Sequence, residues 1–286
     1  MGKEGKKILT YKVEKEPFYQ PMSDTSDEVK EFMDCCNEKI PVALLGPTGC
    51  GKTTLIEAAA FEIAKKSKDE YSGTLTTVLG HEDLTARDLI GGNILEGDKA
   101  KWVDGPATGR ARYGGILYFD ELPEARPNTL TVMHSLTDHR RTLTVDNLEV
   151  VLEAPDNLVI VASWNPNYHN RKMKKSTQQR FWPILLDYQP PEREARIIQK
   201  ITGIKEDMAL TIAQVGDHIR GASNGSRSKG ADLSTRMLIN AAKLIKNNHS
   251  PKKILRRLPS SLQSFSAEEQ KSFNEALDGI LRAMGV

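Results

Sequence analysis

The chain has 286 residues, of which 38% are hydrophobic and 27% are charged, as expected for a globular protein with a buried core. Its 40 basic and 38 acidic residues give a formal net charge of +2, so the whole chain has no electrostatic drive toward nucleic acid or an anionic membrane. It lacks an apolar run of membrane-spanning length, and its three cysteines form no C-x-x-C pair, which argues against a zinc site or a disulfide framework. These features favour a cytoplasmic protein with reduced thiols.

The first residues differ in composition from the rest of the chain. Residues 1–20 are charged and contain Pro17, so we expect an N-terminal arm with one short strand over Ile8–Val13. Apolar residues then recur at helical spacing, which predicts a helix over Asp27–Glu38.

Short apolar runs then alternate with helical patterns. Nearly continuous apolar runs are typical of parallel strands covered on both faces. The predicted strands are Pro41–Leu45, Leu75–Leu79, Ile116–Phe119, Leu158–Ser163 and Ile184–Leu186. Helices are predicted over Thr54–Lys66 and Leu130–Asp138. This alternation predicts βαβ units and an α/β fold with a doubly wound parallel sheet.

Two further segments alternate apolar and polar residues, as β-hairpins do. Arg141–Leu152 has Asp146-Asn147 at its centre, and Gly91–Val103 has Gly97-Asp98 as its candidate turn. We interpret Arg141–Leu152, which lies just before the fourth predicted strand of the sheet, as an insertion into the α/β domain.

Strand patterns stop near Pro190. Helices are predicted over Glu192–Lys200, Lys205–Arg220, Leu233–Lys246 and Ala267–Met284, with no strands between them. We therefore expect an α/β domain over residues 21–188 and a smaller helical domain over residues 189–286.

The first strand leads into a glycine-rich motif. Gly46-Pro-Thr-Gly-Cys-Gly-Lys52-Thr53 fits G-x-x-x-x-G-K-[ST] and opens the helix Thr54–Lys66, the context that distinguishes a phosphate-binding loop from a chance glycine-rich turn. Main-chain N–H groups and the helix N-terminus favour phosphate oxygens there. Lys52 is expected to reach the β- and γ-phosphates of ATP, and the Thr53 hydroxyl to bind Mg²⁺. The predicted nucleotide-binding set is Gly46, Pro47, Thr48, Gly49, Cys50, Gly51, Lys52, Thr53 and Thr54.

A pair of acids ends the strand Ile116–Phe119. Buried adjacent carboxylates are costly unless a cation or water meets them. We therefore predict that Asp120 holds Mg²⁺ and that Glu121 polarises the water that attacks ATP. The alternative is a strand that ends in a charged, solvated turn.

Three other polar residues are candidates with open alternatives. Asn165 could bond the γ-phosphate or the attacking water, or could be a turn residue before Pro166. Arg180 could be a surface charge or an arginine finger in a neighbour's nucleotide site. Arg236, in a helix's first turn, could fold over the γ-phosphate or remain solvated.

A metal site around His134 is conceivable, because Asp138 shares its helical face. Two good ligands are fewer than the three or four that zinc needs, which favours a surface or interface role.

Several segments together resemble the AAA+ ATPases, and more closely the MoxR group in its CbbQ/NirQ/NorQ branch. They are GPTGCGKT at Gly46, HEDLTARDLIGG at His81, KWVDGPATGRAR at Lys101, GGILYFDELPEAR at Gly114, HSLTDHRRTL at His134, VASWNPNY at Val161, STQQRF at Ser176 and LSTRMLINAAKLI at Leu233. Trp164, Trp182 and the basic stretch Asn170–Lys175 depart from the usual branch pattern.

The resemblance implies a catalytic role for Asn165 as sensor 1, Arg180 as the arginine finger and Arg236 as sensor 2. It also implies a helix-2 insert over residues 92–103, a hairpin before sensor 1 over Arg141–Leu152, and a homohexameric ring with ATP between protomers. Members of the branch act with a von Willebrand factor A domain adaptor, of the CbbO or NorD type, on a metal-dependent client.

The client implied first is Rubisco, freed from inhibitory sugar phosphates. The alternatives are nitric oxide reductase or another metalloenzyme. Two hypotheses of other classes are a nucleic-acid translocase, which the charge balance disfavours, and a monomeric small-molecule P-loop kinase.

Overall fold

The computed structural model describes residues 10–25, 27–166, 173–222, 233–259 and 267–283. Contacts divide the chain into two compact units. Unit 1 comprises Met1–Pro17, Ser23–Gly46 and Lys52–Leu186, and unit 2 comprises Phe18–Met22, Pro47–Gly51 and Asp187–Val286.

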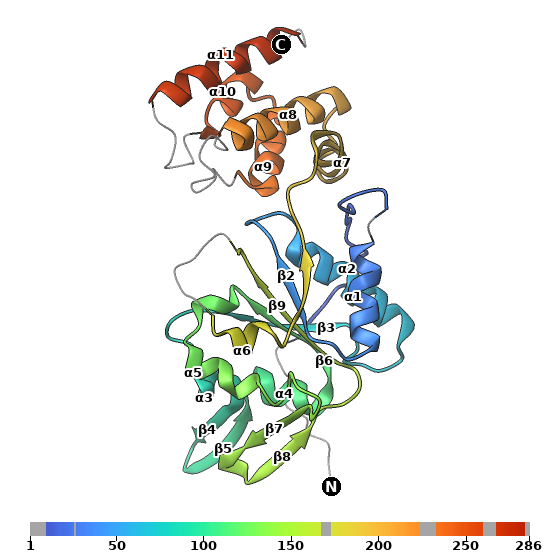
Figure 1. The fold of residues 1–286 in the computed structure, drawn as a ribbon, viewed down its shortest axis with the longest axis vertical. Coiled ribbons are helices and arrows are strands. Elements are labelled where there is room, and N and C mark those ends of the chain that lie inside the picture. The colour runs from blue at the N-terminus through green and yellow to red at the C-terminus, as the bar shows by residue number, and fades with distance from the viewer. Residues whose placement is uncertain (1–9, 26, 167–172, 223–232, 260–266, 284–286) are drawn as a thin grey trace. The chain divides into compact units, whose positions relative to one another are not determined.

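Unit 1 is built on a six-stranded sheet with the order β1-β3-β6-β9-β2-β10 (Figure 1). The short edge strand β1 pairs antiparallel with β3, and the remaining pairs are parallel. The strands are β1 (Tyr11–Lys12), β2 (Val42–Leu45), β3 (Thr74–Leu79), β6 (Gly115–Asp120), β9 (Leu158–Trp164) and β10 (Trp182–Leu185). Chain order and sheet order differ, as the predicted doubly wound sheet requires.

Helices cover both faces of this sheet (Figure 1). Helices α1 (Glu28–Asn37) and α2 (Lys52–Lys66) lie on one side, and α3 (Ala86–Ile90), α4 (Pro106–Tyr113) and α5 (Pro127–Leu130) lie on the other. The central strands β6 and β9 are therefore buried on both faces, which explains their nearly continuous apolar sequences.

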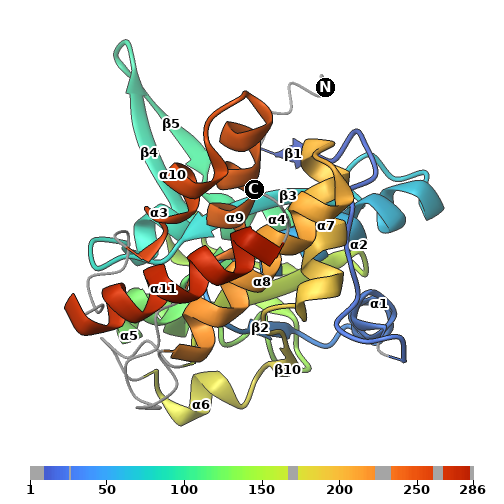
Figure 2. The ribbon, with the colours of Figure 1, turned by 90° about the horizontal axis from the view of Figure 1, so that it is seen from above.

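Both predicted hairpins are present. One consists of β4 (Gly91–Glu96) and β5 (Lys99–Asp104), and the other of β7 (Thr142–Val145) and β8 (Val150–Glu153). Strands from both hairpins contact α4. Figure 2 shows β4 and β5 extending beyond the sheet as a two-stranded ribbon.

Unit 2 contains helices α7 (Pro191–Thr202), α8 (Glu206–Ala222), α9 (Thr235–Lys246), α10 (Pro251–Leu255) and α11 (Ala267–Ala283). Their apolar faces form one core, in which Ile198, Leu238 and Leu277 are completely buried. Glu194 is also completely buried and forms an ion pair with Arg220, with two hydrogen bonds of 2.8 Å.

The structure corrects several details of the sequence prediction. The helix predicted over Leu130–Asp138 is wrong: α5 ends at Leu130 and is followed by the 3₁₀ turn η2 (Thr131–Met133). The chain then turns back, so that the Thr142 amide donates to the Ser135 carbonyl at 3.0 Å. Helices α3, α4 and α10 were not predicted. Of the strand expected over Ile8–Val13, only Tyr11–Lys12 forms a strand among the described residues, since Thr10 and Val13 lie outside it; residues 8 and 9 lie outside the described part of the chain.

Candidate active site

The candidate site lies at the carboxyl ends of three neighbouring parallel strands. Strand β2 leads into Gly46, β6 ends at Asp120, and β9 leads into Asn165. The register pairs Leu45 with Trp164, and the Gly46 amide donates to the Trp164 carbonyl at 3.2 Å. Open α/β sheets bind ligands at this edge. The fold therefore brings together residues that are up to 119 positions apart in sequence (Gly46 to Asn165, 165 minus 46).

Lys52 is the first residue of α2, so its side chain stands at a helix N-terminus, where anions are favoured. The ammonium group is buried, with the residue only 7% exposed, and donates to the Gly46 carbonyl at 2.9 Å. Thr53 is exposed and Thr54 is half-buried in the same first turn. This turn presents a cation and a hydroxyl beside the strand ends, as phosphate and Mg²⁺ binding would need.

The remaining residues of the glycine-rich loop, Pro47–Gly51, group with unit 2. Within this stretch Gly49 and Gly51 have φ values of +74° and +108°, which residues other than glycine rarely adopt. Gly51 is thus required both by the motif and by the backbone, and Gly49, at a variable position of the motif, is required by the backbone alone. The roles of Pro47, Thr48 and Cys50 toward a nucleotide stay predictions.

Asp120 is oriented by two hydroxyl groups. Its Oδ1 accepts a hydrogen bond from the Tyr118 hydroxyl at 2.7 Å and another from Ser163 Oγ at 2.6 Å. The two hydroxyl oxygens are 2.9 Å apart, so their two protons can satisfy any two of the three contacts at once. Among the described residues, no donor meets Asp120 Oδ2. One carboxylate oxygen is therefore fixed, and the other is available to a divalent cation.

Sequence reasoning missed Tyr118 and Ser163. Tyr118 is buried, and burial raises its pKa, so the phenol stays protonated as a donor. A signal was present: Tyr118 stands two residues before Asp120, on the same face of its strand, and Ser163 is a polar residue in an otherwise apolar run. Their contact required the pairing of β6 with β9, which the sequence alone did not predict.

Glu121 has an unusual backbone conformation. It has φ +51° and ψ +47°, the left-handed region, which turns the chain sharply after β6. Gly80 lies against this turn: its amide donates to the Asp120 carbonyl at 2.7 Å, and a Cβ on Gly80 would be 2.2 Å from the Glu121 carbonyl oxygen. Burial raises the pKa of Glu121, while the nearby Lys52 ammonium opposes that shift. A carboxylate with a raised pKa beside a phosphate-type site is suited to accept a proton from water.

Of the other predicted residues, only Asn165 shares this edge. It is 4% exposed and immediately follows β9. Arg180 lies elsewhere, because it precedes β10, whose first residue Trp182 pairs with Val42 at the start of β2. Arg236 is the exposed second residue of α9 in unit 2.

The metal site considered around His134 is not formed. His134 Nε2 lies 3.1 Å from Thr177 Oγ1, and Asp138 binds Arg140 at 2.6 Å. No cluster of three or more His, Cys, Asp or Glu side chains suited to a metal occurs within the described part of the chain. In the same part, no helix has the length and apolarity to cross a membrane.

Comparison with known proteins gives matches over both units. The family model "AAA domain (dynein-related subfamily)" matches residues 41–181, and "CbbQ/NirQ/NorQ C-terminal" matches residues 194–283. Protein CbbQ of Hydrogenophilus thermoluteolus is 38% identical, covering 84% of this chain and 86% of the relative. Protein NorQ of Paracoccus denitrificans is 39% identical over 80% of each chain. The denitrification regulatory protein NirQ of Stutzerimonas stutzeri is 36% identical over 82% of each.

A solved structure of a Thermotoga maritima RuvB mutant has a TM-score of 0.51 at 16% identity, covering 91% of this chain and 74% of that one. At this identity the likeness concerns the fold alone, which agrees with the P-loop α/β architecture of unit 1. The family models and the relatives show that the chain belongs to the CbbQ/NirQ/NorQ family of AAA+ ATPases, enzymes that bind and hydrolyse ATP.

Proposed function

We propose that this ATPase binds Mg·ATP at Gly46–Thr54 and uses hydrolysis to remodel a client enzyme. The observation that carries the assignment of the site is the convergence of Lys52, Asp120, Glu121 and Asn165 at one edge of the sheet. Lys52 offers a cation to the β- and γ-phosphates, and Asn165 offers an amide to the γ-phosphate or the attacking water.

The two carboxylates Asp120 and Glu121 would have different roles, Mg²⁺ binding and activation of water. Asp120, fixed through Oδ1, would bind Mg²⁺ through Oδ2 together with the Thr53 hydroxyl. A Mg²⁺ ion held there would supply positive charge that neutralises the negative charge developing on the phosphate oxygens. Glu121 would orient the attacking water and take up its proton.

The position of Arg180 supports assembly into a ring. Strand β10 has four residues, which span about 13 Å at roughly 3.3 Å per residue. Arg180 precedes the start of β10, whereas Gly46 follows the end of the parallel neighbour β2. Arg180 therefore lies at the amino-terminal ends of these parallel strands, whereas the phosphate-binding loop of the same chain follows the carboxyl-terminal end of β2. As an arginine finger it would serve the nucleotide of an adjacent subunit, in the proposed homohexamer.

We assign Rubisco as the first candidate client, with a von Willebrand factor A domain adaptor of the CbbO type as partner. The 38% identity to CbbQ over most of both chains supports this choice. The second candidate is nitric oxide reductase, with an adaptor of the NorD type, because identity to NorQ is 39%. Arg236 would complete the site as sensor 2.

The nucleotide site is tested by equilibrium ATP binding and phosphate release in three proteins. Lys52→Ala should lose ATP binding, and Asp120→Asn should lose Mg²⁺-dependent hydrolysis. Lys66→Ala removes an exposed lysine from the other end of α2 and should resemble the unmodified chain in both. Unchanged hydrolysis in Lys52→Ala would refute the assignment.

The client is tested with the chain, its adaptor and ATP, added in parallel to inhibitor-bound Rubisco and to inactive nitric oxide reductase. We expect Rubisco activity to be restored, and Glu121→Gln to restore none. Activation of the reductase alone would identify nitric oxide reductase, and not Rubisco, as the client. Activation of neither enzyme would refute both assignments. DNA-stimulated hydrolysis would instead favour a nucleic-acid translocase.

A further inference from the structure

The segment that carries Arg180 is short and largely exposed, with Thr177 and Phe181 as its buried residues. It consists of α6 (Lys175–Gln178) and the turn that leads into β10. A helix of four residues is not stable by itself, so tertiary contacts must fix its place. Arg180 donates from Nη1 to the Ser176 carbonyl at 2.5 Å, a bond within the segment that does not anchor it to the rest of unit 1.

One anchor precedes Arg180. Thr177 is 4% exposed, whereas Ser176 and Gln178 on either side of it are exposed. Its hydroxyl lies 3.1 Å from Nε2 of His134, which is 43 residues away in the sequence and follows η2. The buried hydroxyl thus ties α6 to the stretch His134–Asp138, which had no role in nucleotide binding.

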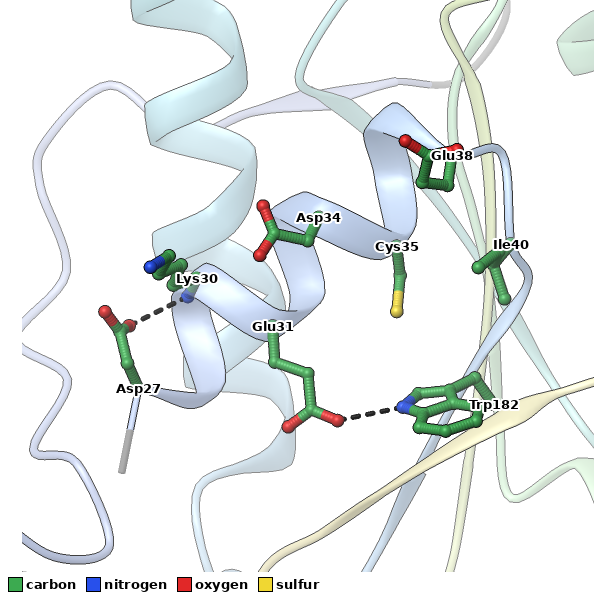
Figure 3. Close-up of a pocket in the computed structure, with 8 residues that line it drawn as sticks. All are labelled: Asp27, Lys30, Glu31, Asp34, Cys35, Glu38, Ile40 and Trp182. Carbon is green, nitrogen blue, oxygen red and sulfur yellow. Dashed lines mark hydrogen bonds between the residues drawn. The ribbon is translucent and has the colours of Figure 1, made fainter. Parts of the chain in front are cut away.

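A second anchor follows Arg180. The Trp182 indole N–H donates to Glu31 Oε1 on α1 at 2.8 Å (Figure 3). The Trp182 amide also donates to the Pro41 carbonyl at 2.7 Å, which starts the pairing of β10 with β2. The indole is half-exposed beside a pocket lined also by Cys35 (Figure 3), so packing alone does not hold it. The bond to Glu31 fixes its orientation.

The surroundings of His134 favour the neutral form of its imidazole. Burial lowers the pKa of His134, and the cations Arg180 and Lys174 lower it further, whereas Asp138 opposes them. A neutral imidazole can pair with the threonine hydroxyl without repelling the guanidinium. His134 is therefore close enough to Arg180 to feel its charge and is linked to it through α6.

From this juxtaposition we infer that His134, through Thr177, and Glu31, through Trp182, are positioning residues that hold Arg180 ready for the nucleotide of a neighbouring subunit. The inference rests on the proposed role of Arg180 as a finger. Thr177 precedes and Trp182 begins β10, and Trp182 pairs with Val42 at the start of β2, whereas Gly46 follows the end of β2.

The test compares isosteric changes at Thr177. Thr177→Val removes the hydroxyl and keeps the shape, and we expect kcat for ATP hydrolysis to fall about 10- to 100-fold with KM unchanged, because a misplaced catalytic group costs rate rather than substrate binding. Thr177→Ser keeps the hydroxyl and should keep kcat. Thr129→Val is the matched control, since Thr129 is also buried and its hydroxyl donates to the Leu84 carbonyl at 2.8 Å. Its kcat should be unchanged.

The second anchor is tested in the same way. Glu31→Gln keeps an oxygen that accepts the indole N–H and should keep kcat, whereas Glu31→Ala should lower it with KM unchanged. A fall in both variants, or in neither, would overturn this half of the inference.

Mixed rings separate positioning from a general structural defect. Thr177→Val subunits keep an intact nucleotide site, and Lys52→Ala subunits keep an intact Arg180 and its anchors. Mixing Lys52→Ala subunits with Thr177→Val subunits should raise hydrolysis above the sum of the two separate preparations. Absence of recovery in rings shown to contain both variants would mean that Thr177→Val damages its own site and would overturn the inference.

Arg180→Ala, assayed alongside, distinguishes the finger role from the positioning role. Full hydrolysis by Arg180→Ala would refute the finger role itself. Loss of hydrolysis in Arg180→Ala with unchanged hydrolysis in Thr177→Val would refute the positioning role alone.

Discussion

The hydroxyl pair that fixes Asp120 gives a quantitative prediction. In Tyr118→Phe the carboxylate loses the donor at 2.7 Å and keeps Ser163 Oγ at 2.6 Å. A hydrogen bond to a charged group is worth about 1.5–3 kcal/mol, but the remaining hydroxyl can still donate, so we expect the lower end, about 1.5 kcal/mol. That corresponds to a roughly tenfold weaker response to Mg²⁺. In Tyr118→Phe/Ser163→Ala no donor is left, and the loss should approach 100-fold, the upper range for partners of metal ligands.

The assay is ATP hydrolysis at saturating ATP, titrated with Mg²⁺, with nucleotide binding measured separately. The concentration of Mg²⁺ at half-maximal rate should rise in the order of unmodified chain, single variant and double variant. Tyr113→Phe is the control, because Tyr113 stacks on Tyr71 at the end of α4 and its hydroxyl is not part of the site. An unchanged Mg²⁺ response in the double variant would refute the proposal that these two hydroxyl groups orient Asp120 for Mg²⁺ binding.

Three other residues give further predictions. Glu121→Gln should bind ATP and lower kcat by about 10²–10⁴-fold. Because burial raises the pKa of Glu121, the ionised form destabilises the fold, and Glu121→Gln should have a higher Tm at neutral pH. This gain in Tm should shrink as the pH falls to the ordinary carboxyl pKa. An equal Tm across that range would contradict this. Gly80→Ala should cost about 1–3 kcal/mol in denaturant unfolding and reduce hydrolysis, since its Cβ would strike the Glu121 carbonyl. Arg220→Met should cost about 3–5 kcal/mol by leaving the buried Glu194 carboxylate without a counter-ion, with the Thr235 hydroxyl still donating to it. Arg220→Met/Glu194→Gln should recover part of that loss, and no recovery would count against the ion pair as the cause.

The strands could be predicted because burial on both faces of the sheet requires nearly continuous apolar sequence. Strands β6 and β9 are apolar along nearly their whole length, and the phosphate-binding motif is fixed by backbone and charge requirements at a strand-to-helix junction. The acids after β6 could be predicted because two adjacent carboxylates at a buried strand end need a partner.

The rest depends on contacts between distant parts of the chain. The stretch after Leu130 has helical spacing but forms only a 3₁₀ turn over Thr131–Met133, and the Ser135 carbonyl then accepts from the Thr142 amide instead of from a helix. The Tyr118–Ser163 contact and the place of Arg180 both follow from the order of strands in the sheet. Strand order is set by the packing of the whole unit, which local patterns do not specify.

The nucleotide site is tested most directly by a crystal structure of Glu121→Gln with ATP and Mg²⁺. The ammonium of Lys52 now donates to the Gly46 carbonyl, and we predict that with nucleotide it bonds β- and γ-phosphate oxygens instead, with Asp120 on the Mg²⁺ side of the site. A triphosphate bound elsewhere, with Lys52 still on the Gly46 carbonyl, would contradict the proposed site.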